Sequence, residues 1–219
     1  MNDNKEKAII GCMIGTAIGD AIALPLEGLS KQRQLRCFTE INRHNLLFGK
    51  GMFSDDTEHT CMVAQSLIYS AGDSAKFSHY LSWELRWWLL LLPGGVGFAT
   101  LRAICKLWLG FPPHKSGVFS AGNGPGMRSA IIGVCYGDDL VKLRQLIKIS
   151  TMITHSDPKA EYGAFAVAIA AFLSTQNSLV IPNDYYNYLL NTLPGEDLDF
   201  LNLIKTACIS AELGESSQY

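Results

Sequence analysis

Apolar and polar residues recur along most of this chain with the three-to-four-residue period of an α-helix, not the two-residue period of a strand. No β-hairpin pattern and no internal repeat is present. The chain is therefore predicted to be all-α, a compact helical bundle forming a single domain over residues 1–219. The periodicity predicts helices over residues 5–23, 54–72, 74–92, 98–109, 139–153, 157–174, 184–190 and 196–213.

Three glycines lie on one face of the first predicted helix. Gly11, Gly15 and Gly19 are spaced four residues apart. Glycine destabilises a helix interior by about 1 kcal/mol relative to alanine, so three on one face need a compensating reason. We expect another helix or a ligand to approach this face closely.

Composition and charge narrow the function classes. Hydrophobic residues make up 48% of the 219 residues, charged residues 17%, and the net charge is −2, which argues against a nucleic-acid partner. The N-terminus is too charged for a signal peptide, and the longest apolar run, Trp87–Pro93, is too short to cross a membrane. We predict a cytoplasmic protein without a membrane partner. The six cysteines are scattered, without zinc-ligand spacing, and are expected to be small buried hydrophobes.

Two acidic clusters offer candidate chemistry. The first is Asp20 with Glu27, directly after the glycine-bearing helix, and the second is Ser54-Asp55-Asp56-Thr57 at a predicted helix start. Hydroxyl and carboxylate oxygens within one turn are the ligands that magnesium or manganese prefer. The same residues also suit simple helix capping, with the aspartates stabilised by the helix dipole. Taken alone, each cluster is better explained by capping or solvation.

A glycine-rich loop and a histidine follow later in the chain. Residues 120–128 read S-A-G-N-G-P-G-M-R, and glycines of this kind let backbone N–H groups approach a phosphate. No βαβ pattern surrounds the loop, so a dinucleotide-binding fold is excluded, and a turn that precedes a helix is the plain alternative. His155 stands immediately before the helix that Pro158 begins, where it suits donation to a phosphate or ribose oxygen.

The order and spacing of these motifs resemble the ADP-ribosylglycohydrolase family, which includes the dinitrogenase reductase-activating glycohydrolases. The motifs are G-C-M-I-G-T-A-I-G-D-A-I-A-L-P-L-E at 11–27, S-D-D-T at 54–57, A-G-N-G-P-G-M-R-S-A at 121–130 and T-H-S-D-P at 154–158. The resemblance extends from about residue 8 to about residue 175. It implies an α-helical fold and a site for two divalent cations, Mg²⁺ or Mn²⁺.

The resemblance also implies roles for individual residues. Ser54, Asp55 and Asp56 would be metal ligands, with serine in place of the commoner threonine. Glu27 would act in catalysis together with Asp55 and Asp56. Asn123, Gly124 and His155 would line the ADP-ribose pocket. Met127 and Arg128 would support the loop, and Asp20 would orient its surroundings.

The C-terminal region departs from the family pattern. Family members carry a second metal-binding D-x-D-T near the C-terminus, whereas Asp197-Leu198-Asp199 is followed here by Phe200. We interpret Asp197 and Asp199 as helix-capping residues. The domain is thus expected to be short at its C-terminus, as a truncated or naturally short form, with only half of the metal ligands visible. We expect weak metal binding and slow hydrolysis by these 219 residues alone.

Three functions are compatible with these observations. The leading one is a metal-dependent hydrolase that removes ADP-ribose from arginine or serine side chains, or from a small ADP-ribosyl compound. The second is a catalytically inactive ADP-ribose-binding or regulatory protein of the same fold. The third is a structural helical domain in which the acidic helix starts are only caps.

Overall fold

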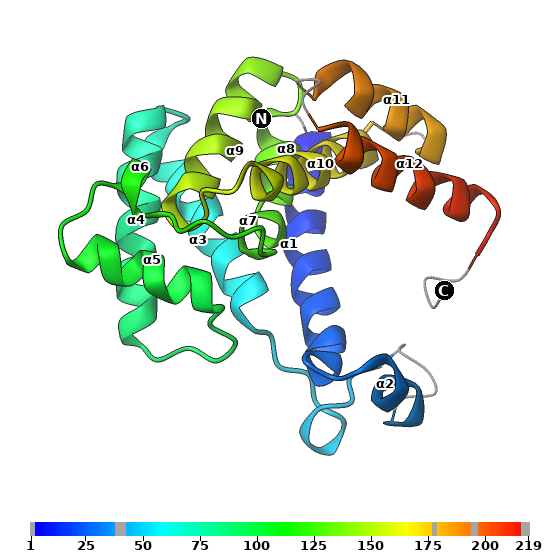
Figure 1. The fold of residues 1–219 in the computed structure, drawn as a ribbon, viewed down its shortest axis with the longest axis horizontal. Coiled ribbons are helices and arrows are strands. Elements are labelled where there is room, and N and C mark those ends of the chain that lie inside the picture. The colour runs from blue at the N-terminus through cyan, green and yellow to red at the C-terminus, as the bar shows by residue number, and fades with distance from the viewer. Residues whose placement is uncertain (1–2, 38–42, 177–178, 194–196, 216–219) are drawn as a thin grey trace.

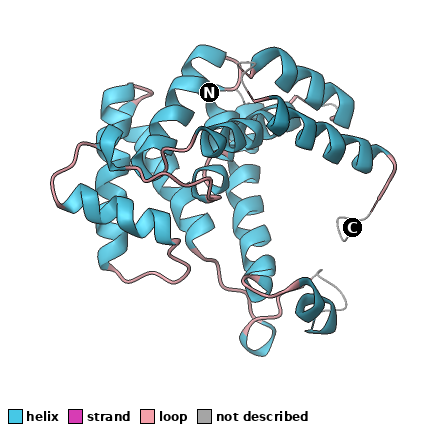
Figure 2. Ribbon diagram, viewed as in Figure 1, coloured by secondary structure: helices cyan, strands magenta, loops and turns pink. Residues whose placement is uncertain are grey.

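A computed structural model describes residues 3–37, 43–176, 179–193 and 197–215. Within these ranges the chain is made of helices and loops without a strand, apart from isolated bridges at Leu46–Lys50 and Val118–His155 (Figure 2). The elements are α1 (Asp3–Ala23), η1 (Leu24–Leu26), α2 (Lys31–Cys37), η2 (Leu47–Gly49), α3 (Asp55–Ser70), α4 (Ser74–Leu90), α5 (Phe98–Trp108), α6 (Pro113–Ser116), α7 (Gly124–Met127), α8 (Ala130–Tyr136), α9 (Leu140–Thr154), α10 (Pro158–Ser174), α11 (Pro182–Thr192) and α12 (Leu198–Glu212). The all-α prediction is confirmed.

The long helices begin and end within a few residues of their predicted bounds. Glu196, the predicted start of the last helix, lies outside the described residues. The sequence did not predict α2, α6, α7 and α8, because each has at most seven residues and therefore shows less than two full turns of periodicity.

The core lies mainly among α3, α4, α5, α8, α9 and α10, which pack against one another (Figure 1). Its fully buried side chains include Val63, Leu81, Ile104, Ile132 and Leu146. Removal of each such side chain from water stabilises the fold by roughly 1.5–3 kcal/mol. These helices hold the ends of α3, α7 and α9 in fixed positions, and the site described below is built from those ends.

A glycine permits the close contact of α8 with α10. A Cβ atom at Gly133 would collide with the main-chain carbonyl of Ala168. Main-chain atoms cannot move away as a flexible side chain can, so only glycine fits at this crossing.

The glycine-bearing face of α1 is open in the described structure. No described atom lies within 4 Å of a Cβ placed at Gly11, Gly15 or Gly19, so the expected close approach of another helix is absent there. The helix instead contacts α3 and α8, and it buries Asp20 and Ala21 at its C-terminal end. Figure 1 shows α1 running through the middle of the view, with α4 and α5 to one side and α12 to the other.

The apolar character of α1 has a second consequence. The segment Asp3–Leu26 has a mean hydropathy of 1.8 with 11% of its apolar window buried, so by length and composition alone it passes the test for a membrane span. Core helices of soluble proteins and N-terminal signal sequences pass the same test, which makes this weak support for a span.

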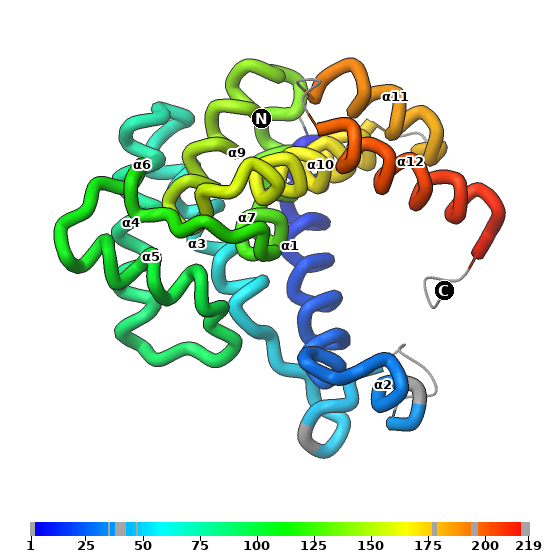
Figure 3. Tube along the Cα trace, in the orientation of Figure 1, coloured from blue at the N-terminus to red at the C-terminus, as the bar shows by residue number. Residues whose placement is uncertain are grey.

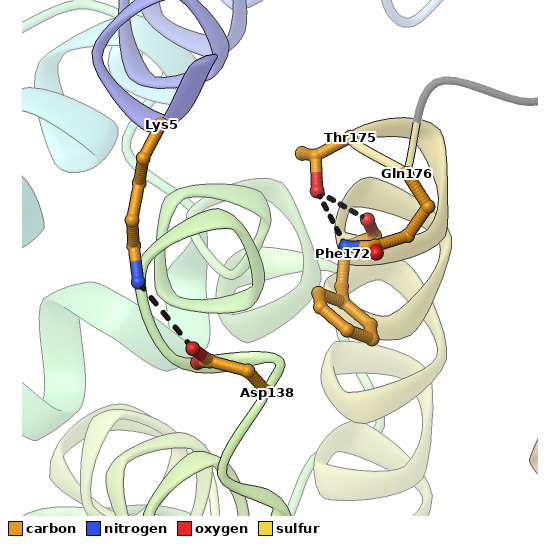
Figure 4. Close-up of polar contacts among 5 residues, drawn as sticks. All are labelled: Lys5, Asp138, Phe172, Thr175 and Gln176. Carbon is orange, nitrogen blue, oxygen red and sulfur yellow. Dashed lines mark hydrogen bonds and ion pairs between the residues drawn. The ribbon is translucent and has the colours of Figure 1, made fainter. Parts of the chain in front are cut away.

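The N-terminal turn of α1 lies beside the turn that joins α8 to α9 (Figure 4). Lys5 Nζ is 3.8 Å from an Asp138 carboxylate oxygen. Nearby, the hydroxyl of Thr175 donates to the carbonyl oxygen of Phe172 at 2.7 Å and ends α10. Both contacts are near the surface, where an ion pair contributes at most about 1 kcal/mol.

The expectation of buried cysteines is largely wrong. Cys208 is buried and Cys12 and Cys135 are half-buried, whereas Cys37, Cys61 and Cys105 are exposed. The helical period placed these thiols among apolar residues without showing which face each would occupy.

Candidate functional site

Asp20, at the end of α1, holds the start of α3. Its Oδ2 accepts hydrogen bonds from the Ser54 N–H at 2.8 Å, the Thr57 N–H at 3.1 Å and the Thr57 hydroxyl at 2.5 Å. Its Oδ1 accepts from the Ser54 hydroxyl at 2.7 Å. The first N–H groups of a helix have no partner within the helix, and here a carboxylate from another element supplies it. Ser54 occupies the N-cap position as predicted, but its hydroxyl is bound to Asp20 and makes no capping hydrogen bond.

The next two carboxylates open onto a cleft. Burial and the neighbouring charge of Asp56 raise the pKa of Asp55 to about 6, with smaller contributions from Glu27 and Asp20. Burial, Asp20 and Glu27 also raise the pKa of Asp56. Within the described residues, ion pairs join Lys5 to Asp138 and Lys7 to Asp3, and neither Asp55 nor Asp56 is part of an ion pair. The described residues that line the cleft with these two aspartates include Glu27 but no lysine or arginine, so the site concentrates negative charge.

The cleft has a volume of about 390 Å³, within the range of small-molecule sites. We call it the acidic cleft. It is lined by Glu27, Asp55, Asp56, Gly95, Gly97, Phe98, Ala99, Thr100, Ser120, Gly122, Asn123, Gly124, Met127 and His155. Another cavity, of about 160 Å³ between α9 and α10, is smaller and shares no lining residue with it.

The loop before α5 forms one wall of the acidic cleft. Gly95 has a φ of +81°, and a Cβ there would lie 2.7 Å from Asp55 Oδ1. Glycine is thus required at this position by the backbone conformation and by the closeness of the carboxylate. The sequence signalled a break at Pro93-Gly94-Gly95 but did not show that the loop returns to Asp55.

The glycine-rich loop and His155 form another wall of the acidic cleft. The 117–118 segment is fixed to the end of α9, because Val118 N–H donates to the Thr154 carbonyl at 3.2 Å and Ser156 N–H donates to the Val118 carbonyl at 2.9 Å. The chain then continues past Gly122 into α7, which begins at Gly124 (Figure 3). A Cβ at either glycine would lie within 3.0 Å of the His155 imidazole, so the ring packs directly against this loop.

Arg128 lies behind this wall and is fully buried. Its Nε donates to the Ser150 hydroxyl at 3.1 Å, Nη1 to His59 Nδ1 at 3.1 Å, and Nη2 to the Ser150 carbonyl and the Thr154 hydroxyl, both at 2.7 Å. Burial lowers its pKa to about 10, so the guanidinium remains charged at neutral pH. It joins α3, α7 and α9 through hydrogen bonds to neutral acceptors.

The structure brings six predicted site residues together in the acidic cleft: Glu27, Asp55, Asp56, Asn123, Gly124 and His155. Ser54 is buried beside Asp20 and is not a lining residue. Met127 lines the cleft, whereas Arg128 supports the loop from behind, as expected. The sequence did not identify Phe98, Thr100 or the polar network behind His155, because none of them forms a recognisable motif.

The donor set at Asp55 and Asp56 fits a divalent cation in part. Their adjacent carboxylates, with Glu27 also lining the cleft, are hard oxygen donors with excess negative charge. Within the described ranges, no group of three or more His, Cys, Asp or Glu side chains is arranged to hold a metal ion. The Asp197 carboxylate accepts from the Phe200 N–H at 3.0 Å and caps α12, which confirms its predicted capping role.

Comparisons with known proteins agree with this architecture. Residues 1–216 match the model of the ADP-ribosylglycohydrolase family. An uncharacterised protein of Archaeoglobus fulgidus is 32% identical over 172 residues, covering 75% of this chain and 55% of its own length. The ADP-ribosylhydrolase ARH3 of Danio rerio is 27% identical over 203 residues, covering 84% of this chain and 52% of its own length. The chain belongs to the ADP-ribosylglycohydrolase family, and it spans about half the length of these relatives.

Proposed function

We propose that this chain carries the ADP-ribose site and half of the metal site of a metal-dependent hydrolase that removes ADP-ribose from protein side chains, arginine or serine. The observation that supports this most strongly is the meeting of Glu27, Asp55 and Asp56 with the glycine-rich loop and His155 in one cleft. Segments up to 128 residues apart contribute to it, which simple capping of separate helices does not explain.

Each part of the cleft suits one part of such a substrate. The loop at Gly122–Gly124 lets main-chain atoms approach a pyrophosphate, and His155 offers a ring nitrogen to a phosphate or ribose oxygen. Asp55 and Asp56 would hold Mg²⁺ or Mn²⁺, which when bound lowers the pKa of a coordinated water. Glu27 is an exposed residue of the cleft lining, where it would orient a water or accept its proton.

A second candidate function is ADP-ribose binding without hydrolysis. The partial donor set favours it, because the carboxylates that would bind a cation come from Asp55 and Asp56 of α3, whereas Asp197 caps α12.

We place the protein in the cytoplasm, and ADP-ribosylated protein or a small ADP-ribosyl compound is the partner we propose.

Titration calorimetry with ADP-ribose, with and without Mg²⁺, separates these functions. Metal-dependent binding, together with release of ADP-ribose from modified arginine or serine peptides, supports the hydrolase. Metal-independent binding without release supports the binding protein, and no binding refutes both. Asp56→Ala should remove the metal dependence, whereas Asp184→Ala, an exposed first-turn aspartate of α11, should not.

A further inference from the structure

We propose that Arg128 and Thr154 are positioning residues that fix the tautomer of His155, so that its Nε2–H faces the acidic cleft as a hydrogen-bond donor. This inference rests on the proposed function for its ligand, ADP-ribose. The assignment of the His155 tautomer itself rests on hydrogen-bond geometry and does not depend on the proposed function.

The chain of hydrogen bonds has a definite direction at its first step. Thr154 Oγ1 lies 2.7 Å from Arg128 Nη2, and a guanidinium can only donate. The Thr154 hydroxyl therefore accepts from Arg128. Thr154 is fully buried, so its single hydroxyl hydrogen needs an acceptor nearby.

His155 Nδ1, 2.9 Å from Thr154 Oγ1, is that acceptor. If Nδ1 carried the proton instead, Thr154 would receive two donors and its own hydrogen would stay buried without an acceptor, which is unfavourable. A neutral imidazole that accepts at Nδ1 carries its proton on Nε2.

The charge state of the ring agrees with this assignment. Burial and the charge of Arg128 lower the pKa of His155 to about 4, so the ring is neutral at pH 7. Nε2 lies on the side of the ring that faces the loop, 3.0 Å from where a Cβ of Gly122 would stand. The Nε2–H is thus available to an acceptor oxygen, such as a phosphate or ribose oxygen, in the cleft.

The second buried histidine provides an internal comparison. His59 Nδ1 accepts directly from Arg128 Nη1, without a threonine between them. His59 therefore also carries its proton on Nε2. Its tautomer should not depend on Thr154.

Long-range ¹H–¹⁵N spectra of histidine-labelled protein read these tautomers directly. The chain has five histidines, and His155→Gln assigns the signal of interest. At pH 7 we expect His155 to be unprotonated at Nδ1 and protonated at Nε2. Thr154→Val should mix or reverse the His155 tautomer while leaving His59 unchanged, and Thr154→Ser should restore it.

The functional consequence is measured by calorimetry with ADP-ribose. Loss of one oriented donor should weaken binding about tenfold in Thr154→Val, with Thr154→Ser close to the unmodified protein. Thr192→Val is the matched control, a buried threonine of α11 whose hydroxyl donates to the Tyr188 carbonyl away from the cleft.

A His155 protonated at Nδ1 in the unmodified protein, or a tautomer unchanged in Thr154→Val, overturns the inference. Failure of the unmodified protein to bind ADP-ribose overturns the proposed function instead. The spectra decide the tautomer in that case too, so the two failures are distinguishable.

Discussion

Replacement of Asp20 should destabilise the protein through the start of α3. Asp20 is 6% exposed and accepts four hydrogen bonds, three of them at Oδ2. In Asp20→Asn one oxygen keeps those three bonds but loses its charge, which removes roughly 1 kcal/mol from each. Relief from burying a charge offsets part of this loss, so we expect a decrease of about 2 kcal/mol in the free energy of unfolding. Asp20→Ala leaves four buried donors without an acceptor and should cost about 4 kcal/mol.

Urea unfolding and thermal melting test these magnitudes. For a chain of this size, about 2 kcal/mol corresponds to a midpoint roughly 4–8 °C lower. The control is Asp199→Asn, an exposed aspartate in the first turn of α12, whose loss of charge should cost only a few tenths of a kcal/mol. If Asp20→Asn were no less stable than this control, the carboxylate would not hold the helix start and the reasoning would fail.

Three further changes test the cleft and the core. Asp55→Asn should stabilise the metal-free protein by about 1 kcal/mol at pH 8 and by almost nothing at pH 4, a figure reduced for solvent screening in the cleft. The sign follows because the folded-state pKa of Asp55, about 6, lies above its ordinary value of 3.8, so the unmodified protein loses stability as the pH rises through that window. Urea unfolding in EDTA is the measurement, and an Asp55→Asn variant that is less stable than the unmodified protein at pH 8 would contradict this prediction. Gly124→Ala should weaken ADP-ribose binding in calorimetry and lower the free energy of unfolding by about 1 kcal/mol, since its Cβ would lie 2.8 Å from the buried His155 ring, which must shift. Unaltered affinity argues against this wall as the binding surface. Gly133→Ala should lower the free energy of unfolding by about 3 kcal/mol because of its collision with the Ala168 carbonyl, and a melting temperature equal to that of the unmodified protein would show that α8 and α10 can move apart.

The sequence predicted the long helices because each shows at least two turns of periodicity, joined by clear stops. Pro158, for instance, marks the first turn of α10, and Asp157 caps it by accepting from the Lys159 N–H at 2.9 Å. The open face of α1 was not predicted. Four-residue spacing of glycines shows that a close approach is possible, but it carries no information on whether a partner element is present.

The candidate site was predictable as a set of residues but not as a network. The acidic pair at 55–56 and the glycine-rich loop are local signals, readable from spacing. The partners of Asp20 are 34 and 37 residues away, and those of Arg128 come from two other helices. From the sequence alone an arginine is expected at the surface, so only the packing of α3, α7 and α9 reveals the buried role of Arg128.

The same arrangement explains why a capping interpretation of Ser54-Asp55-Asp56 is incomplete. A capping aspartate gains stability from the helix start, whereas burial and mutual repulsion raise the pKa of Asp55 to about 6. A carboxylate that destabilises its own folded state is expected where charge serves a ligand and not the fold. Asp20 accepts the helix N–H and hydroxyl groups in their place, which leaves Asp55 and Asp56 free to face the cleft. Division of the two tasks between α1 and α3 is what the proposed cation site at the start of α3 would require.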